Sequence, residues 1–127
     1  MSQHEPSDAE LEILQILWAE QPASVRDVFE QISKQRKLSY TTVLTVLQRM
    51  TDKGLVERTK EGKAHLYLAV AKEQEVQLSL SERLLKTAYK GSGMNMALHA
   101  LGQSKVSQAE LAELQQWLNT QKSTEDE

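Results

Sequence analysis

The chain of 127 residues has room for one ordinary domain or two small units, and it is too short for a large enzyme fold. Charged residues make up 26% of it, the mean hydropathy is −0.52, and no apolar run approaches the roughly 20 residues of a membrane span, so we expect a cytoplasmic globular protein. The amino terminus has acidic residues where a signal peptide needs basic and apolar ones. The absence of cysteine excludes disulfides, thiolate metal sites and cysteine nucleophiles.

The net charge of −3 hides an uneven distribution of charge along the chain. Residues 1–21 contain five acids and no Lys or Arg, whereas residues 22–70 contain nine Lys and Arg against five acids. The remaining residues carry six bases and eight acids. Because salt screens charges beyond roughly 8 to 10 Å, a polyanion responds to the local positive potential of the middle segment and not to the total.

Two short helices are predicted first. Ser7–Glu10 fits a capping box, and the helix that it begins should end before Pro22. The apolar face of this helix consists of Leu11, Leu14, Leu17 and Trp18. Ser24 can cap a second helix, which leads into the basic turn 34–37. The apolar residues of the second helix are Val25, Val28, Phe29 and Ile32.

A third helix with two unlike faces is predicted between the cap Ser39 and the terminator Gly54. At about 100° per residue, its apolar side consists of Val43, Val46, Leu47 and Met50. The opposite side carries Thr41, Leu44, Thr45, Gln48, Arg49 and Asp52. The β-branched residues lower the helix propensity, so packing of the apolar side must stabilise this helix.

Two strands at residues 55–60 and 64–70 are predicted to form a hairpin, with Glu61-Gly62 as its two-residue turn. Lys60, Lys63 and His65 lie at and beside the tip of this hairpin. A long helix should follow over residues 72–89, a short one over 94–101 and a last one, capped by a second box at 107–110, over 108–121.

The helices expected over residues 72–89 and 108–121 carry apolar seams that a lone hairpin of helices could not cover. The seams include Leu80, Leu84, Leu85, Leu111, Leu114, Trp117 and Leu118. We expect the partner that covers them to be a second copy of the chain related by a two-fold axis, and the alternative is that these helices fold back on the first unit.

These elements predict a mainly α fold with a small β-hairpin. Three helices and a hairpin outline a winged helix-turn-helix DNA-binding domain in residues 1–71, followed by a helical dimerisation region in residues 72–127. The third helix would enter the major groove by its amino-terminal half, because Asp52 would be repelled by the DNA backbone. The residues expected to contact DNA are Ser24, Arg26, Tyr40, Thr41, Thr42, Leu44, Thr45, Gln48, Arg49, Lys60, Lys63 and His65.

The chemistry of these side chains suits base edges and phosphates. Thr41 and Thr45 can hydrogen-bond and also touch a thymine methyl, Leu44 suits a thymine methyl, and Gln48 can pair with adenine. The hairpin lysines and His65 are placed for phosphates. The competing interpretation is that a threonine-rich helix face and tip lysines are ordinary solvated surface, and the order of the elements favours DNA binding.

No catalytic residue, cofactor or metal is expected. The sequence contains no Ser/His/acid set, phosphate loop or HExxH motif, so we predict that the protein is not an enzyme. Met94, Met96 and His99 are the residue types of a soft-metal site, but methionines at this spacing are more often apolar filler between helices.

Four stretches of the sequence resemble the BlaI/MecI/CopY group of penicillinase-type repressors. They are AELEILQILW from Ala9, SVRDVFEQI from Ser24, LSYTTVLTVLQRMTDKGLVER from Leu38 and YKG from Tyr89. The resemblance runs from about Ala9 to Leu118 and is most specific in the third stretch. It implies a homodimeric winged-helix repressor with interlocking carboxy-terminal helices, which binds double-stranded inverted repeats of the TACA/TGTA kind.

The resemblance also implies site residues and ways of release. Thr41, Thr42 and Thr45 correspond to the base-reading set, and residues 60–65 correspond to the wing. The copper-responsive branch uses Cys-x-Cys pairs, which this chain lacks. The β-lactam branch is cleaved at an Asn-Phe bond, where this chain has His99-Ala100, so the site does not carry over, and a different regulatory protease acting on residues 91–102 is the alternative.

Two other functions compete with this hypothesis. A winged helix can bind protein instead of DNA, and the salt dependence of binding would distinguish the two. A ligand-sensing regulator of the MarR or PadR type would share the DNA-binding module. Such chains usually have a longer helix before the winged unit or a longer coiled tail after it, whereas only about six residues precede the first cap here, so we rank this function second.

Overall fold

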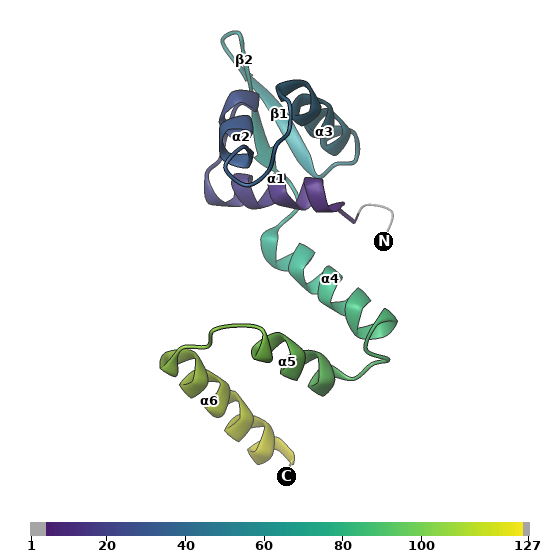
Figure 1. The fold of residues 1–127 in the computed structure, drawn as a ribbon, viewed down its shortest axis with the longest axis vertical. Helices are drawn as coiled ribbons and strands as arrows, with labels where there is room; N and C mark the ends of the chain where they lie inside the picture. The colour runs from purple at the N-terminus through teal and green to yellow at the C-terminus, as the bar shows by residue number, and fades with distance from the viewer. Residues whose placement is uncertain (1–4, 126–127) are drawn as a thin grey trace. The chain divides into compact units, whose positions relative to one another are not determined.

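The computed structural model describes residues 5–125 (Figure 1), so His4 lies outside the described part of the chain. The elements are α1 (Asp8–Ala19), α2 (Val25–Ile32), α3 (Tyr40–Asp52), β1 (Val56–Glu61), β2 (Ala64–Ala69), α4 (Glu73–Thr87), α5 (Gly93–Gly102) and α6 (Gln108–Glu125). They form two compact units, of which the first ends at Glu82 and the second begins at Arg83, within α4. None of the described helices is both long and apolar enough to cross a membrane.

The predicted starts of α1, α2 and α3 are confirmed. At each start a serine hydroxyl accepts a hydrogen bond from the backbone amide three residues later. The Ser7 hydroxyl accepts from the amide of Glu10, whose carboxylate in turn accepts from the amide of Ser7 at 2.9 Å. Ser24 begins α2 through a reciprocal pair with Asp27, and Ser39 begins α3 by accepting from the amide of Thr42.

The core of the first unit is built from one face of each of the three helices and from the hairpin. Helix α1 contacts α2, α3 and β2, while α3 also packs on α2 and β1. The fully buried large side chains include Ile13, Leu14, Leu17, Val28, Ile32, Val43, Leu47, Met50, Val56 and Tyr67. The apolar side of α3 therefore faces the core as predicted, and this leaves its polar side to solvent.

The hairpin differs from its prediction by one residue at the turn. Strands β1 and β2 pair antiparallel with Glu61 opposite Ala64, so the two-residue turn is Gly62-Lys63 and not Glu61-Gly62. Gly62 has φ 64°, the left-handed conformation that the first position of a primed hairpin turn requires. Figure 1 shows the tip of this hairpin extending beyond the helices of the first unit.

Contacts on both sides of the hairpin fix it to the helices. The backbone of Ala23, between α1 and α2, pairs with that of Tyr67 through two hydrogen bonds of 2.8 and 3.1 Å. The indole of Trp18 in α1 donates to the carbonyl oxygen of Ala71 at 2.8 Å, where β2 leads into α4. The first unit continues beyond residue 71 into α4, where Val76 is buried.

The second unit contains the end of α4, together with α5 and α6. The predicted capping box of the last helix is present, since Ser107 and Glu110 exchange hydrogen bonds of 2.9 and 3.0 Å. Between residues 83 and 124 no described residue is buried. This unit therefore lacks a core of its own within one copy of the chain.

Candidate nucleic-acid interface

Helix α3 exposes a polar side to solvent, and its diameter matches the width of a DNA groove. Thr41, Thr45 and Gln48 are exposed along it, opposite the buried side of the helix. With side chains, an α-helix is roughly 10 to 12 Å across, which matches the roughly 12 Å width of the major groove. The structure thus presents the predicted base-reading side chains together on one surface.

The threonine hydroxyls of α3 differ in what they can offer to a base. The Thr45 hydroxyl donates to the carbonyl oxygen of Thr41 at 2.9 Å, so only its lone pairs and its methyl are left for a ligand. The Thr42 hydroxyl lies 2.9 Å from the hydroxyl of Ser39 at the helix start. Within the described part of the chain the Thr41 hydroxyl has no partner and can both donate and accept.

Two of the predicted contact residues are also packing residues. Leu44 is half-buried against the core, which gives a structural reason for an apolar residue on this side of α3. The ring of Tyr40 meets that of Phe29 edge-on, with centroids 5.7 Å apart. These contacts fix the beginning of α3 against α2.

Arg49 pairs with a buried carboxylate near the other end of α3. Its Nε donates to Glu10 Oε2 at 3.1 Å, and Lys53 Nζ lies 3.0 Å from both oxygens of Glu10. Glu10 is fully buried, whereas the Arg49 and Lys53 side chains are 50% and 31% exposed. This ion pair network joins the start of α1 to the end of α3, where Asp52 is exposed.

The environment of Glu10 changes its pKa in two opposite ways. Burial raises the pKa of the carboxyl, but the hydrogen bond from the Ser7 amide and the contacts with Lys53 and Arg49 outweigh it. The pKa of Glu10 therefore lies below its ordinary value of 4.5, and the carboxylate stays charged near neutral pH.

The hairpin separates its charges between its two sides. Val56 and Tyr67 are buried, which defines the side that faces the core, and side chains alternate along each strand. Arg58, Lys60 and His65 share that side further toward the tip, with Lys60 directly opposite His65 in the register. The other side carries Glu57 and Glu61. We call the first of these the basic side of the hairpin.

A hollow of about 330 Å³ lies where the hairpin tip meets α2 and α3. Its lining residues are Ser24, Val25 and Arg26 from the start of α2, Tyr40 and Leu44 from α3, and Lys63, Ala64 and His65 from the hairpin. We call it the wing hollow. It brings together six of the residues predicted to contact DNA, and no acidic residue lines it.

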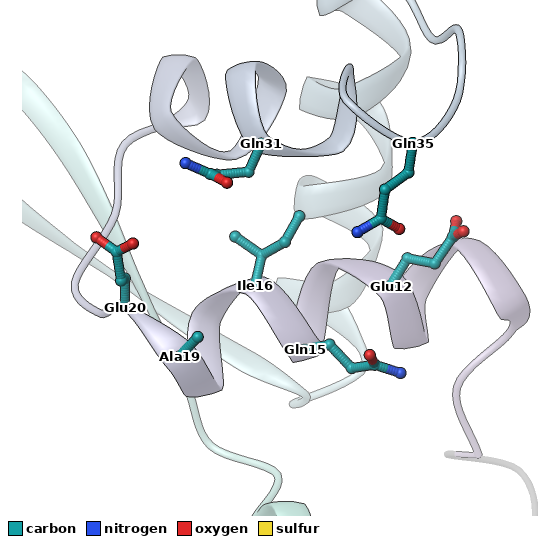
Figure 2. A pocket seen from close by; sticks show the side chains of 7 residues that line it. All are labelled: Glu12, Gln15, Ile16, Ala19, Glu20, Gln31 and Gln35. Atoms are coloured by element: carbon teal, nitrogen blue, oxygen red, sulfur yellow. The ribbon is translucent and has the colours of Figure 1, made fainter. Parts of the chain in front are cut away.

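The groove between α1 and α2 has the opposite character. Figure 2 shows Glu12 and Glu20 toward its two ends, with Ile16 and the glutamines Gln15, Gln31 and Gln35 between them. The carboxylate of Glu12 binds Arg36. An adjoining hollow adds Asp27 and Glu30. These carboxylates would repel phosphates, so this side of α2 is unsuited to DNA.

The predicted dimerisation residues are partly or largely exposed. Leu80, Leu85 and Leu114 are half-buried, and the others are exposed: Leu84, Leu111, Trp117 and Leu118. Trp117 is 58% exposed. Leu114, Trp117 and Leu118 line an apolar groove of about 520 Å³ with residues of α5, including Met94 and Leu98. His99 contacts Tyr89, with 3.4 Å between its Nδ1 and the phenolic oxygen.

Two charged residues near the candidate interface were not predicted as part of it from the sequence. Arg58 belongs to the basic side of the hairpin, and the alternation of side chains from Lys60 was the signal that could have found it. Glu10 was recognised as a capping residue, but its ion pairs with α3 bring together residues 39 and 43 positions apart, and no local pattern indicates them.

Three helices, the third with an exposed polar side, followed by a hairpin with one basic side, define a winged-helix DNA-binding protein. The sequence pattern of the penicillinase repressor family matches residues 6–120. The chain belongs to this family of DNA-binding transcriptional repressors.

Known relatives extend over most of the chain. The methicillin resistance regulatory protein MecI of Mammaliicoccus sciuri is 31% identical over 116 residues, which cover 91% of this chain and 94% of MecI. The penicillinase repressor of Bacillus licheniformis is 31% identical over 121 residues, or 95% of this chain and 94% of that protein. The solved DNA-binding domain of the repressor BlaI, also 31% identical, matches 56% of this chain and 87% of that structure with a TM-score of 0.51.

Proposed function

We propose that this protein is a homodimeric transcriptional repressor that binds an inverted-repeat operator of the TACA/TGTA type. Each protomer places the amino-terminal half of α3 in the major groove of one half-site, while the hairpin contacts the neighbouring phosphates. Residues 1–71 bind DNA, and residues 72–127 hold the two protomers together.

The observation that supports this proposal best is the exposed side of α3 next to a basic hairpin. Gln48 offers an amide that can pair with adenine, and the methyl groups of Thr41 and Thr45 suit thymine. The bond from the Thr45 hydroxyl to Thr41 leaves Thr45 an acceptor, which fits an exocyclic amino group of a base. Sequence reading and phosphate binding are thus assigned to different elements.

A second copy of the chain is the partner that best fits the second unit. Large apolar side chains such as Met94, Leu98 and Trp117 are exposed in it, and a groove lined by apolar residues runs between α5 and α6. A self-complementary apolar surface is covered by a two-fold partner. Dimerisation also raises affinity, because two half-sites bind together.

We assign the release of the repressor from its operator to the second unit. The chain lacks the cysteines of a copper switch, and its His99-Ala100 bond lies within α5, where a protease needs local unfolding before it can bind an extended strand. Gly91 and Ser92, just before α5, are exposed and not helical. Cleavage by a regulatory protease within residues 91–102 would separate α6 from the DNA-binding unit and dismantle the dimer.

Binding to labelled duplexes tests the proposal. A duplex with a TACA/TGTA inverted repeat and a scrambled duplex of equal length are titrated with the full chain and followed by fluorescence anisotropy. We expect the repeat to bind at least 10³-fold more tightly, an order typical of specific binding. Equal affinity for the two duplexes, or a monomer by sedimentation at concentrations where the repeat is saturated, would contradict it.

A further inference from the structure

The wing hollow has the composition of an anion site. Arg26 and Lys63 line it from two different elements, and His65 lines it from β2. The remaining lining residues are small, apolar or hydroxyl-bearing: Ser24, Val25, Tyr40, Leu44 and Ala64. Since the hollow lies beside the DNA-reading side of α3, the anion that reaches it first on a duplex is a backbone phosphate diester.

The charges around His65 come from every element that packs near it. In the hairpin, Lys60 is its cross-strand partner and Lys63 lies two residues before it. From α2, Arg26 lines the same hollow, and from α3 the neutral phenol of Tyr40 does so. His65 therefore shares its surroundings with cations and neutral groups.

The nearby acids do not line the hollow, but Glu30 pairs with Arg26, which does. The Asp27 carboxylate accepts the amide hydrogen of Ser24 at 3.0 Å, and Glu30 lies 3.8 Å from the guanidinium of Arg26. Asp27 and Glu30 line a different hollow, between α1 and α2. Glu57 and Glu61 are on the other side of the hairpin. None of these carboxylates lines the hollow as a counter-charge for a protonated His65.

Protonation of His65 adds a further positive charge to a hollow that already holds cations. A phosphate bound in the hollow brings negative charge within hydrogen-bond distance of the ring, and its attraction favours the charged form. Histidine is the side chain that changes its charge most readily near neutral pH. The proton comes from solvent to one ring nitrogen, and the resulting imidazolium donates an N–H to a phosphate oxygen.

We propose that a DNA backbone phosphate binds in the wing hollow and that His65 takes up a proton when it does so. The inference rests on the proposed DNA-binding function and deepens it. DNA affinity then rises as pH falls through the neutral range, by at most about tenfold per pH unit for each hollow engaged. The phosphate contact is independent of base sequence, so a scrambled duplex shows the same trend.

The test is the pH dependence of binding by the full chain. Affinity for the TACA/TGTA repeat and for a scrambled duplex is measured by anisotropy from about pH 6 to about pH 8.5, at constant ionic strength because salt alone changes it. His65→Gln should show little gain in affinity between high and low pH, whatever its affinity at high pH. His65→Arg should bind tightly at every pH, since its charge is permanent.

The other two histidines provide the control. The sequence has three histidines, so a His4→Gln/His99→Gln double variant keeps His65 alone, and it should retain the full pH dependence. A wild type without pH dependence, a His65→Gln protein with the wild-type dependence, or a double variant that loses it would each overturn the proposal. His65 is exposed on a short strand, and circular dichroism confirms that each variant is folded.

Failure of the proposed function would look different. In that case the protein binds the repeat and the scrambled duplex equally at every pH. The pH dependence of binding to the scrambled duplex still tests whether a phosphate binds in the wing hollow. Absence of the pH dependence with an intact preference for the repeat would refute proton-linked phosphate binding in the wing hollow. It would not contradict the proposed repressor function.

Discussion

The Glu10→Gln substitution tests whether the ion pairs of the buried Glu10 carboxylate stabilise the first unit. Glu10 is fully buried and binds the Ser7 amide, the Nε of Arg49 and the Nζ of Lys53, all within 3.1 Å. Glutamine keeps the shape and can still accept from the Ser7 amide, but it loses the charge that attracts both cations. The substitution therefore isolates the ionic contribution from packing.

The size of the expected loss depends on how far the two partners of Glu10 are exposed to solvent. Breaking a fully buried pair costs about 3 to 5 kcal/mol when it leaves a buried charge alone. Here the charges left behind are on Arg49 and Lys53, which are 50% and 31% exposed and can turn to water. We therefore expect a loss of about 2 kcal/mol in the free energy of unfolding, or roughly 10 °C in the melting temperature.

The measurement is urea or thermal unfolding followed by circular dichroism at one protein concentration, because the proposed dimerisation would make stability depend on concentration. Glu12→Gln is the matched control, since it removes a carboxylate from the same helix whose partner Arg36 is at the surface. That variant should lose at most about 1 kcal/mol. Equal stability of the Glu10→Gln and Glu12→Gln proteins would refute the role given to the network.

Four further outcomes are expected. Because the pKa of Glu10 is lowered on folding, its stabilisation is present above about pH 4.5 and is lost as pH falls through the folded pKa, so unfolding curves of the wild type and Glu10→Gln should converge in acid; a constant gap would contradict this. Thr45→Ala should weaken binding to the repeat by about 1 to 3 kcal/mol and leave scrambled DNA unaffected in anisotropy titrations, whereas equal losses would argue against base reading. Lys63→Ala should weaken binding to both duplexes and reduce the slope of log affinity against log salt by about 1, and Lys105→Ala, which removes the same charge from the second unit, should not. Leu114→Glu should give a monomer in sedimentation that loses most of its affinity for the repeat; a dimer would place the interface elsewhere.

The sequence by itself determined the helices and where they begin, whereas α4 ends two residues before its prediction and α6 continues to Glu125, four residues past it. Ser7, Ser24 and Ser39 cap α1, α2 and α3 through atoms three residues away, so the interaction is contained within one turn of chain. Gly54 follows α3 with φ 80°, as predicted for its terminator. The two faces of α3 were predictable for the same reason, because helical periodicity is a local property.

Tertiary structure decided how those elements share their side chains. The register of β1 and β2 sets the turn at Gly62-Lys63 and not at the predicted Glu61-Gly62. It places Lys60 and His65 on one side of the hairpin and Glu61 on the other. Packing of α3 on α1 brought Arg49 to a carboxylate far away in the sequence. Such placements depend on which surfaces of the folded chain meet. They are set only when the apolar faces pack together, so no local sequence pattern indicates them.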